Sequence, residues 1–265
     1  MRARTWTFVA LAATAALPAC RQSFRLSRYT NNNIALFDAS MREFQKRHWA
    51  NAILGFEKLT NELPARDTLL PRSYWFLATA HVRQKDNLLA AQAFTRLYES
   101  FPDDTSADDA ALEAARSYKR LWRKPVLDAT YGETALSTYN TLIGLFPTSE
   151  LAESARNEIL ELEQGFATKN FEIGRYYYRR KAYDSAVIYL KTVIERWPHV
   201  PRAREAMIML ADTYRVIKYR EDLNDICAVI RRDYADDTAA RKSCASVPVA
   251  TADSIKTASK PPVSP

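Results

Sequence analysis

The side chains best able to do chemistry in this chain are its three cysteines and three histidines. His48, His81 and His199 fall in different parts of the chain, and no two have the spacing of a metal-ligand pair. The sequence contains neither a glycine-rich phosphate-binding loop nor a G-x-S-x-G nucleophile elbow. We therefore expect no catalytic residue, no metal and no cofactor, and we predict that the protein is not an enzyme.

Cys20 lies in surroundings that point to a specific modification. Two arginines precede a short, mostly apolar run that ends in the tetrapeptide L-P-A-C at Cys20. A basic start, a short apolar run and a small-residue exit are typical of a secretory signal peptide, and this run is too short to span a membrane. The tetrapeptide resembles the bacterial lipobox, in which the cysteine is acylated. We predict a signal peptide over residues 1–19, lipidation at Cys20 and a polar lipidated tether over residues 20–33. The alternative is an ordinary secreted protein with an incidental Cys20.

The residue after Cys20 bears on location. By resemblance to Gram-negative lipoproteins, in which an aspartate at this position tends to retain the protein in the inner membrane, Arg21 favours the periplasmic face of the outer membrane. The formal net charge is +7, which suits an anionic lipid surface or an acidic partner. Basic residues are interspersed with acidic ones and no groove-reading motif is present, so we expect no binding to nucleic acid.

The two remaining cysteines are Cys227 and Cys244. An oxidising compartment permits a disulfide between them. The simpler interpretation is a buried Cys227 on a helix and an exposed Cys244 in a frayed end. The sequence alone leaves the pairing open, because it does not supply the distance between the two residues.

Four segments of the chain share one pattern: an alanine, a large apolar residue four positions later, and a proline eight positions after that. Alanine lets two helices cross closely, the large residue one turn on fills the gap between them, and proline ends the helix. This is the closing pattern of a tetratricopeptide repeat (TPR). The four prolines are Pro64, Pro102, Pro147 and Pro198, and the large residues are Phe56, Phe94, Tyr139 and Leu190.

The repeats predict an all-α fold, a TPR-type α-solenoid of about five helix-turn-helix repeats over residues 34–238. A loop is expected over residues 124–130, and a continuous helix over 151–168 that runs into the fourth repeat. Residues 239–265 are rich in proline and small polar residues, so we expect a disordered tail. The predicted repeats cover residues 34–66, 70–104, 107–149, 168–200 and 202–237.

The first helices of repeats one and two supply a candidate binding surface. In a TPR superhelix these helices line the inner curve, and side chains that the core does not need are free to face a ligand. Mixed polar and apolar character suits an extended β-strand precursor. For each single residue the alternative is a solvated helix position without a ligand. The candidate groove residues are Asp38, Met41, Gln45, Thr79 and Arg83.

Beyond the generic repeat, the stretches Leu36–Leu59, Leu127–Leu142 and Ala152–Pro198 resemble the BamD family, also known as ComL, of outer-membrane β-barrel assembly lipoproteins. The resemblance implies a lipid-anchored periplasmic scaffold that works with the barrel-forming subunit and other assembly lipoproteins. It further implies that the N-terminal repeats bind unfolded outer-membrane proteins and that the C-terminal repeats dock on the barrel-forming subunit. Lys181 departs from the family, which usually has glycine there.

A second interpretation of the sequence is another cell-envelope TPR lipoprotein that coordinates peptidoglycan or division proteins. An accessory domain of an enzyme is a more distant third. Co-purification of a β-barrel subunit would favour the first interpretation, and binding to cell-wall fractions the second.

Overall fold

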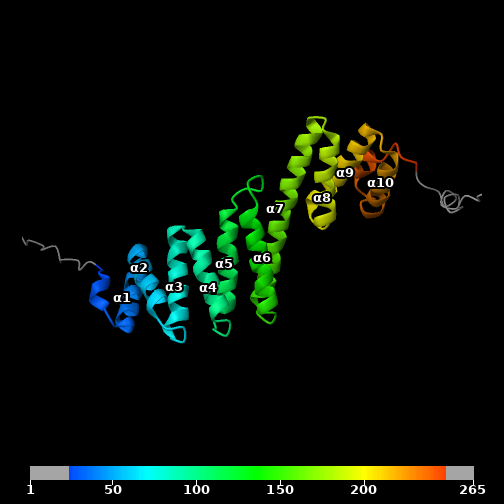
Figure 1. Ribbon diagram of the computed structural model, residues 1–265. Coiled ribbons are helices and arrows are strands. Elements are labelled where there is room, and N and C mark those ends of the chain that lie inside the picture. Colours follow the sequence, from blue (N-terminus) through cyan, green and yellow to red (C-terminus); the bar gives the residue numbers. More distant parts are fainter. Residues whose placement is uncertain (1–23, 249–265) are drawn as a thin grey trace, which may run out of the picture.

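The computed structural model describes residues 24–248 of the 265-residue chain and contains no strand within that range (Figure 1). The helices follow one another along the chain with short connections. They are η1 (Leu26–Tyr29), α1 (Asn33–Gln45), α2 (Trp49–Glu62), α3 (Leu69–Gln84), α4 (Asn87–Ser100), α5 (Ala107–Leu121), α6 (Thr130–Leu145), α7 (Leu151–Arg179), α8 (Tyr183–Arg196), α9 (Pro201–Ile217), α10 (Arg220–Asp233) and α11 (Thr238–Ser243).

The helices from α1 to α10 form five antiparallel pairs, α1/α2, α3/α4, α5/α6, α7/α8 and α9/α10, stacked side by side (Figure 1). Each helix packs chiefly against its neighbours in the chain, so the apolar core runs along the stack instead of gathering at one centre. The all-α, TPR-type solenoid predicted from the sequence is therefore confirmed. The predicted loop is also present, between α5 and α6.

The second helix of each of the first four pairs explains the repeated sequence pattern. Phe56 is fully buried, Phe94 is 1% exposed, and the alanine one turn before each is fully buried. Arg96, two positions after Phe94, is exposed, as the helical phase requires. Each of these helices ends just before its proline, whose missing amide hydrogen cannot continue the backbone hydrogen-bond ladder.

The longest helix, α7, has 29 residues and connects two parts of the stack. Its first half packs against α5 and α6, and its second half pairs with α8 and contacts α9. In Figure 1 it extends well past α6, so the last two pairs are displaced along its axis. The predicted continuity of residues 151–168 with the fourth repeat is confirmed.

A polar network fixes the first half of α7. The Glu158 carboxylate accepts hydrogen bonds from the Tyr139 hydroxyl (2.5 Å), the Arg116 guanidinium (2.7 Å) and the Lys119 ammonium (3.2 Å). Burial raises the pKa of Glu158, but these hydrogen bonds outweigh burial and hold the pKa below its usual value. A single carboxylate on α7 thus links side chains from both α5 and α6.

An aromatic contact completes the same junction. The Trp122 ring, just after α5, lies against Gly132 of α6 and Gly165 of α7, and it stacks on Phe166 with 4.6 Å between ring centroids. A Cβ at Gly132 would lie 2.5 Å from the indole, and one at Gly165 would lie 2.8 Å from it. Glycine at both positions therefore permits the close approach of three helices around one indole.

Two segments expected to be unstructured differ from that expectation in part. In the predicted tether, Phe24, Leu26 and Tyr29 pack on the core of the first pair, because Gly55 of α2 leaves room for the Phe24 ring. In the predicted tail, residues 239–248 are ordered: α11 packs against α9 and α10. Composition alone did not predict that these segments are ordered, because their order comes from contacts with residues distant in the sequence. The predicted signal peptide, Cys20 and residues 249–265 lie outside the described part of the chain.

The Trp122 contact leads to a stability prediction with a control in the same helix. Gly132→Ala should destabilise the protein by about 1–3 kcal/mol, because the indole is held between Gly165 and Phe166 and has little room to retreat. Gly144→Ala, at a position with nothing within 4 Å, should instead stabilise α6 by about 0.5–1 kcal/mol. Chemical denaturation measures both changes, and equal effects at the two glycines would contradict the account.

Candidate functional site

The candidate groove residues lie along the contact between α1 and α3. Aromatic rings hold these helices together: Phe76 of α3 lies 6.3 Å from Phe37 and 5.3 Å from Phe44 of α1 between ring centroids. The Arg72 guanidinium of α3 lies 5.0 Å from the centre of the Phe37 ring. One face of each helix is therefore brought beside the other, although the two helices belong to different repeats.

The five predicted residues lie on these two faces with different exposure. Asp38, Gln45 and Arg83 are exposed, whereas Met41 and Thr79 are half-buried. The Thr79 hydroxyl donates to the Trp75 carbonyl of its own helix at 2.8 Å, so its hydrogen-bonding capacity is partly used. The structure thus places all five where a ligand along α1 and α3 could reach them.

Sequence reasoning missed two further side chains on this surface. Ile34 is 69% exposed and lies one turn before Asp38 on α1, and Arg72 lies two turns before Thr79 on α3. The helical spacing i, i+4, i+7 and i+11 from Ile34 to Gln45 was the signal that could have identified Ile34. With these two residues the surface, called here the α1/α3 surface, has apolar, cationic and anionic groups in alternation.

The three histidines lie in separate parts of the fold, each with different neighbours. His81 is buried on α3, and its pKa is lowered mainly by burial, with nearby acidic groups opposing the shift. His48 lies 2.9 Å from Glu43, and His199 lies 2.6 Å from Glu163. Across residues 24–248, no group of three or more potential metal-ligating His, Cys, Asp or Glu side chains is present.

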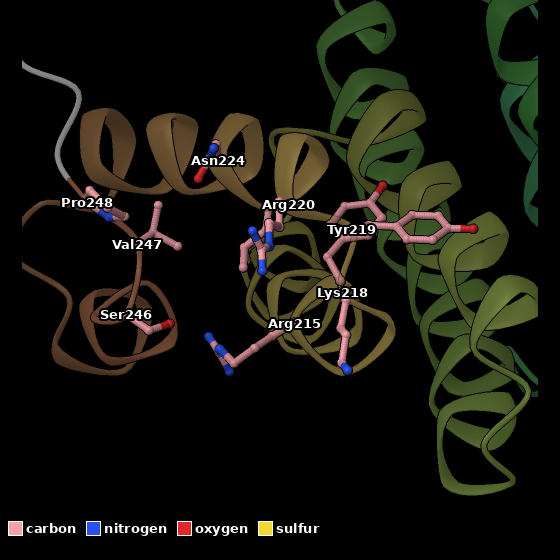
Figure 2. A pocket seen from close by; sticks show the side chains of 10 residues that line it. Arg215, Lys218, Tyr219, Arg220, Asn224, Ser246, Val247 and Pro248 are labelled. Atoms are coloured by element: carbon pink, nitrogen blue, oxygen red, sulfur yellow. The ribbon is translucent and has the colours of Figure 1, made fainter. Parts of the chain in front are cut away.

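A second candidate surface is a hollow of about 440 Å³ at the C-terminal end of the stack. Figure 2 shows Lys218 and Tyr219, from the turn between α9 and α10, and Arg220, the first residue of α10, on one side of it. Ser246, Val247 and Pro248 lie on the other side. Cationic groups and apolar atoms face the same space, a combination suited to a partner that offers acidic and apolar side chains together.

Covalent and polar contacts hold the far wall of this hollow. Cys227 of α10 and Cys244 form a disulfide, with 5.5 Å between their Cα atoms. Both cysteines are buried, so the simpler interpretation of an exposed Cys244 is wrong: docking of α11 brings the two thiols together. Arg231 of α10 donates to the carbonyls of Cys244 (3.0 Å) and Val247 (2.5 Å).

The start of α11 is held by an ion pair. Arg204 of α9 donates to the Asp237 carboxylate, which also caps α11 by accepting from the Ala240 amide at 3.0 Å. The hydrogen bond from Arg204 is the main reason that the pKa of Asp237 is lowered to about 2. Arg215 of α9 donates to the Ser243 carbonyl at the other end of α11.

A family model described as YfiO, outer membrane lipoprotein, matches residues 30–226 of this chain. The match runs from the first helix into α10 and covers well over half of the sequence. The chain belongs to the YfiO family of outer membrane lipoproteins. The resemblance to BamD noted in the sequence is thereby confirmed, because the curated relatives of this YfiO-family chain carry that name.

Three of those relatives are each named outer membrane protein assembly factor BamD. The protein from Caulobacter vibrioides is 24% identical over 206 residues, which cover 76% of this chain and 66% of the relative. The protein from Xylella fastidiosa is 22% identical, with 68% and 64% covered, and that from Pasteurella multocida is 20% identical, with 85% and 87% covered. The YfiO-family chain thus spans slightly less than two thirds of the first two relatives.

Solved structures similar to this YfiO-family chain include the P58(IPK) TPR domain, which is 14% identical with a TM-score of 0.43. The alignment covers 80% of this chain and 54% of that chain. They also include TTC0263, a TPR protein of Thermus thermophilus, at 17% identity with a TM-score of 0.34, where 81% and 97% are covered. Both superpositions are weak. No helix within residues 24–248 is long and apolar enough to cross a membrane.

The disulfide leads to a prediction for the C-terminal end of the YfiO-family stack. The disulfide closes a loop between cysteines that are 17 positions apart in the sequence, and a loop of this size stabilises the folded protein by about 3 kcal/mol. Residues 21–265 retain only these two cysteines. In a protein consisting of residues 21–265, reduction of the disulfide should increase amide hydrogen exchange in α10 and α11. Exchange in α1 to α4 should not change. A variant carrying Cys227→Ser and Cys244→Ser should show the amide hydrogen exchange of the reduced protein, and adding reductant should not change it. Identical exchange in oxidised and reduced protein would contradict the prediction.

Proposed function

We propose that this chain is a lipid-anchored periplasmic scaffold of the outer-membrane β-barrel assembly machinery. The observation that carries the proposal is the YfiO-family match over residues 30–226, together with relatives named as outer membrane protein assembly factors. The extended stack of helix pairs supports it, because such a stack offers a long surface to partners. In this proposal the protein acts by binding and performs no chemical step.

The α1/α3 surface is proposed to bind unfolded β-barrel precursors. Its side chains alternate in character over two adjacent helices, with exposed Ile34 beside Asp38 and with Met41 beside Gln45. An extended precursor strand presents backbone hydrogen-bonding groups together with side chains that alternate between two faces. Asp38, Gln45 and Arg83 can bond the backbone, while Ile34 and Met41 offer apolar contact to every second side chain.

The C-terminal hollow is proposed to receive the periplasmic part of the barrel-forming subunit. Arg215, Lys218 and Arg220 supply positive charge, and Tyr214 and Val247 supply apolar area. The disulfide and the Arg231 hydrogen bonds hold the far wall in place before any partner arrives. A preformed site reduces the entropy that a partner must otherwise lose to order it.

The proposed precursor site can be tested by photo-crosslinking. A crosslinking amino acid at each of five positions on the α1/α3 surface should capture an unfolded outer-membrane β-barrel precursor. Gln92 and Arg96, exposed on α4, are matched control positions in the second pair. Precursor adducts should be several-fold more abundant from the first set, and an excess of unlabelled precursor should remove them. Equal yields from both sets would refute the assignment of this surface. The test positions are Asp38, Met41, Gln45, Thr79 and Arg83.

The proposed anchor can be tested at Cys20. Cys20→Ala removes the thiol that acylation requires, so the variant should remain uncleaved or be released to the periplasm, while the wild type fractionates with the outer membrane. Mass spectrometry of the mature N-terminal peptide should show acyl chains on Cys20. A variant that is processed normally and remains with the outer membrane as fully as the wild type would rule out the lipid anchor.

A further inference from the structure

The turns of the stack form two opposite edges. The turns that join the helices within a pair lie along the upper edge in Figure 1. The turns that join successive pairs, together with the turn from α10 to α11, lie along the lower edge. We call these the within-pair edge and the between-pair edge. The within-pair edge comprises residues 46–48, 85–86, 122–129, 180–182 and 218–219, and the between-pair edge comprises residues 63–68, 101–106, 146–150, 197–200 and 234–237.

The two edges carry opposite charge. The within-pair edge has eight Lys and Arg residues against two Asp residues, and the between-pair edge has one Arg against six acidic residues. The cations occur in all five within-pair turns, so the positive charge runs the length of the stack. They are Lys46, Arg47, Lys85, Arg123, Lys124, Arg180, Lys181 and Lys218.

These cations are available to a partner. All eight side chains are exposed. Of the eight, Lys46 alone forms an ion pair within residues 24–248, with its Nζ 4.0 Å from Glu43. The Arg180 guanidinium lies 4.9 Å from the centre of the Tyr176 ring, which orders it without neutralising it. Their positive charge is therefore directed outward.

Backbone conformation adds a second observation. Arg47, Lys85, Lys181 and Lys218 have positive φ values of 62°, 69°, 62° and 63°. This left-handed conformation ends a helix most easily with glycine, which has no Cβ to crowd the carbonyl oxygen. Four equivalent turns therefore have a cation at a position where the backbone favours glycine.

Helix capping accounts for part of the acidic charge on the between-pair edge, because Asp67, Asp104 and Asp237 accept hydrogen bonds from backbone amides at or just before the following helix starts. Helix ends do not account for the cations of the within-pair edge. Every turn on either edge joins the C-terminus of one helix to the N-terminus of the next. The helix dipole favours a cation at the first end and an anion at the second, so its effect is the same on both edges. The row of cations on the within-pair edge needs another cause, and contact with an anionic surface is a sufficient one.

Exposed apolar side chains gather on the same edge. Within residues 24–248, thirteen large hydrophobic residues are exposed. Eight of them lie in the within-pair turns or the adjoining helix ends, and two lie at the between-pair edge. Side chains of this kind beside Lys and Arg are typical of protein surfaces that enter the headgroup region of a bilayer. The eight are Leu88, Leu89, Val126, Leu127, Tyr131, Tyr176, Val216 and Tyr219.

We propose that the within-pair edge is a membrane-facing surface that rests on anionic phospholipid headgroups. The proposal builds on the lipid anchor of the proposed function. Cys20 precedes Phe24 by four residues and so lies within about 14 Å of it, which keeps the first pair close to the bilayer. The cationic edge then lays the other pairs along the same surface and turns the acidic between-pair edge towards the periplasm.

The extent of the edge favours a bilayer over an acidic protein. Packed helices lie about 8–10 Å apart, so successive within-pair turns lie about 20 Å apart along the stack. A standard protein interface covers about 800 Å² on each side and would engage only part of such a row. A lipid surface is extended enough to meet all five turns.

The test uses residues 21–265, which contain the whole described fold and lack the acylated cysteine. Binding is measured by co-flotation with vesicles of phosphatidylcholine, with or without one third phosphatidylglycerol. The variant substitutes three of the left-handed cations by glycine, which removes charge without straining the turns. Lys218 is kept because it lines the C-terminal hollow. The control removes three exposed cations located away from this edge. The variant is Arg47→Gly, Lys85→Gly and Lys181→Gly, and the control is Arg66→Gln, Arg96→Gln and Arg156→Gln.

The wild type and the control should bind anionic vesicles in a salt-sensitive way and bind neutral vesicles weakly. Each cation near an anionic surface strengthens binding about fivefold, so the glycine variant should bind at least tenfold more weakly than the control. The glycine variant should melt at or above the wild-type temperature, which excludes misfolding.

Equal vesicle binding by the glycine variant and the control would overturn the proposal. Absence of binding to anionic vesicles by the wild type would overturn it as well. Capture of the barrel-forming subunit is scored separately in the same proteins. Loss of lipid binding with subunit capture intact supports the membrane edge. Failure of all three proteins to capture the subunit would count against the proposed function alone.

Discussion

A helix pair cannot bury its apolar face alone, so each pair depends on packing against the next. The helix α7 takes part in packing in both halves of the stack. Its first half completes the third pair and its second half begins the fourth. Glu158 binds Tyr139 and Arg116 there, and the Trp122 ring occupies the space left by Gly132 and Gly165. Because α7 is one continuous helix, the position of the N-terminal surface relative to the C-terminal hollow is set by this junction.

The two candidate surfaces lie towards opposite ends of the stack, and this separation suits a scaffold. A precursor bound near α1 and α3 and a partner bound near α9 and α10 do not compete for the same residues. The edges of the stack add a further distinction, since one edge is cationic with exposed apolar side chains and the other is acidic. In the proposed arrangement, the ends of the stack bind protein partners and the within-pair edge contacts the membrane.

The sequence predicted those parts of the fold that local spacing encodes. The interval from alanine to Phe56 or Phe94 to the closing proline corresponds to one helix, and the uninterrupted pattern after residue 151 predicted α7. The disulfide, the packing of Phe24 and the ordering of residues 239–248 could not be predicted, because each depends on a contact between distant segments. For the candidate site, helical phase identified Asp38, Gln45 and Arg83 as exposed. It missed Arg72, whose role depends on α3 lying beside Phe37. The cationic edge became visible only once the fold showed which turns share an edge.

The most direct test of the scaffold role is purification of the full-length acylated protein, carrying an affinity tag after Pro265, from detergent-solubilised outer membranes of its native host. The account predicts that an integral outer-membrane β-barrel protein with periplasmic domains is recovered in near-equal amount and persists through a salt wash. Recovery of peptidoglycan-binding or division proteins without any β-barrel partner would contradict it.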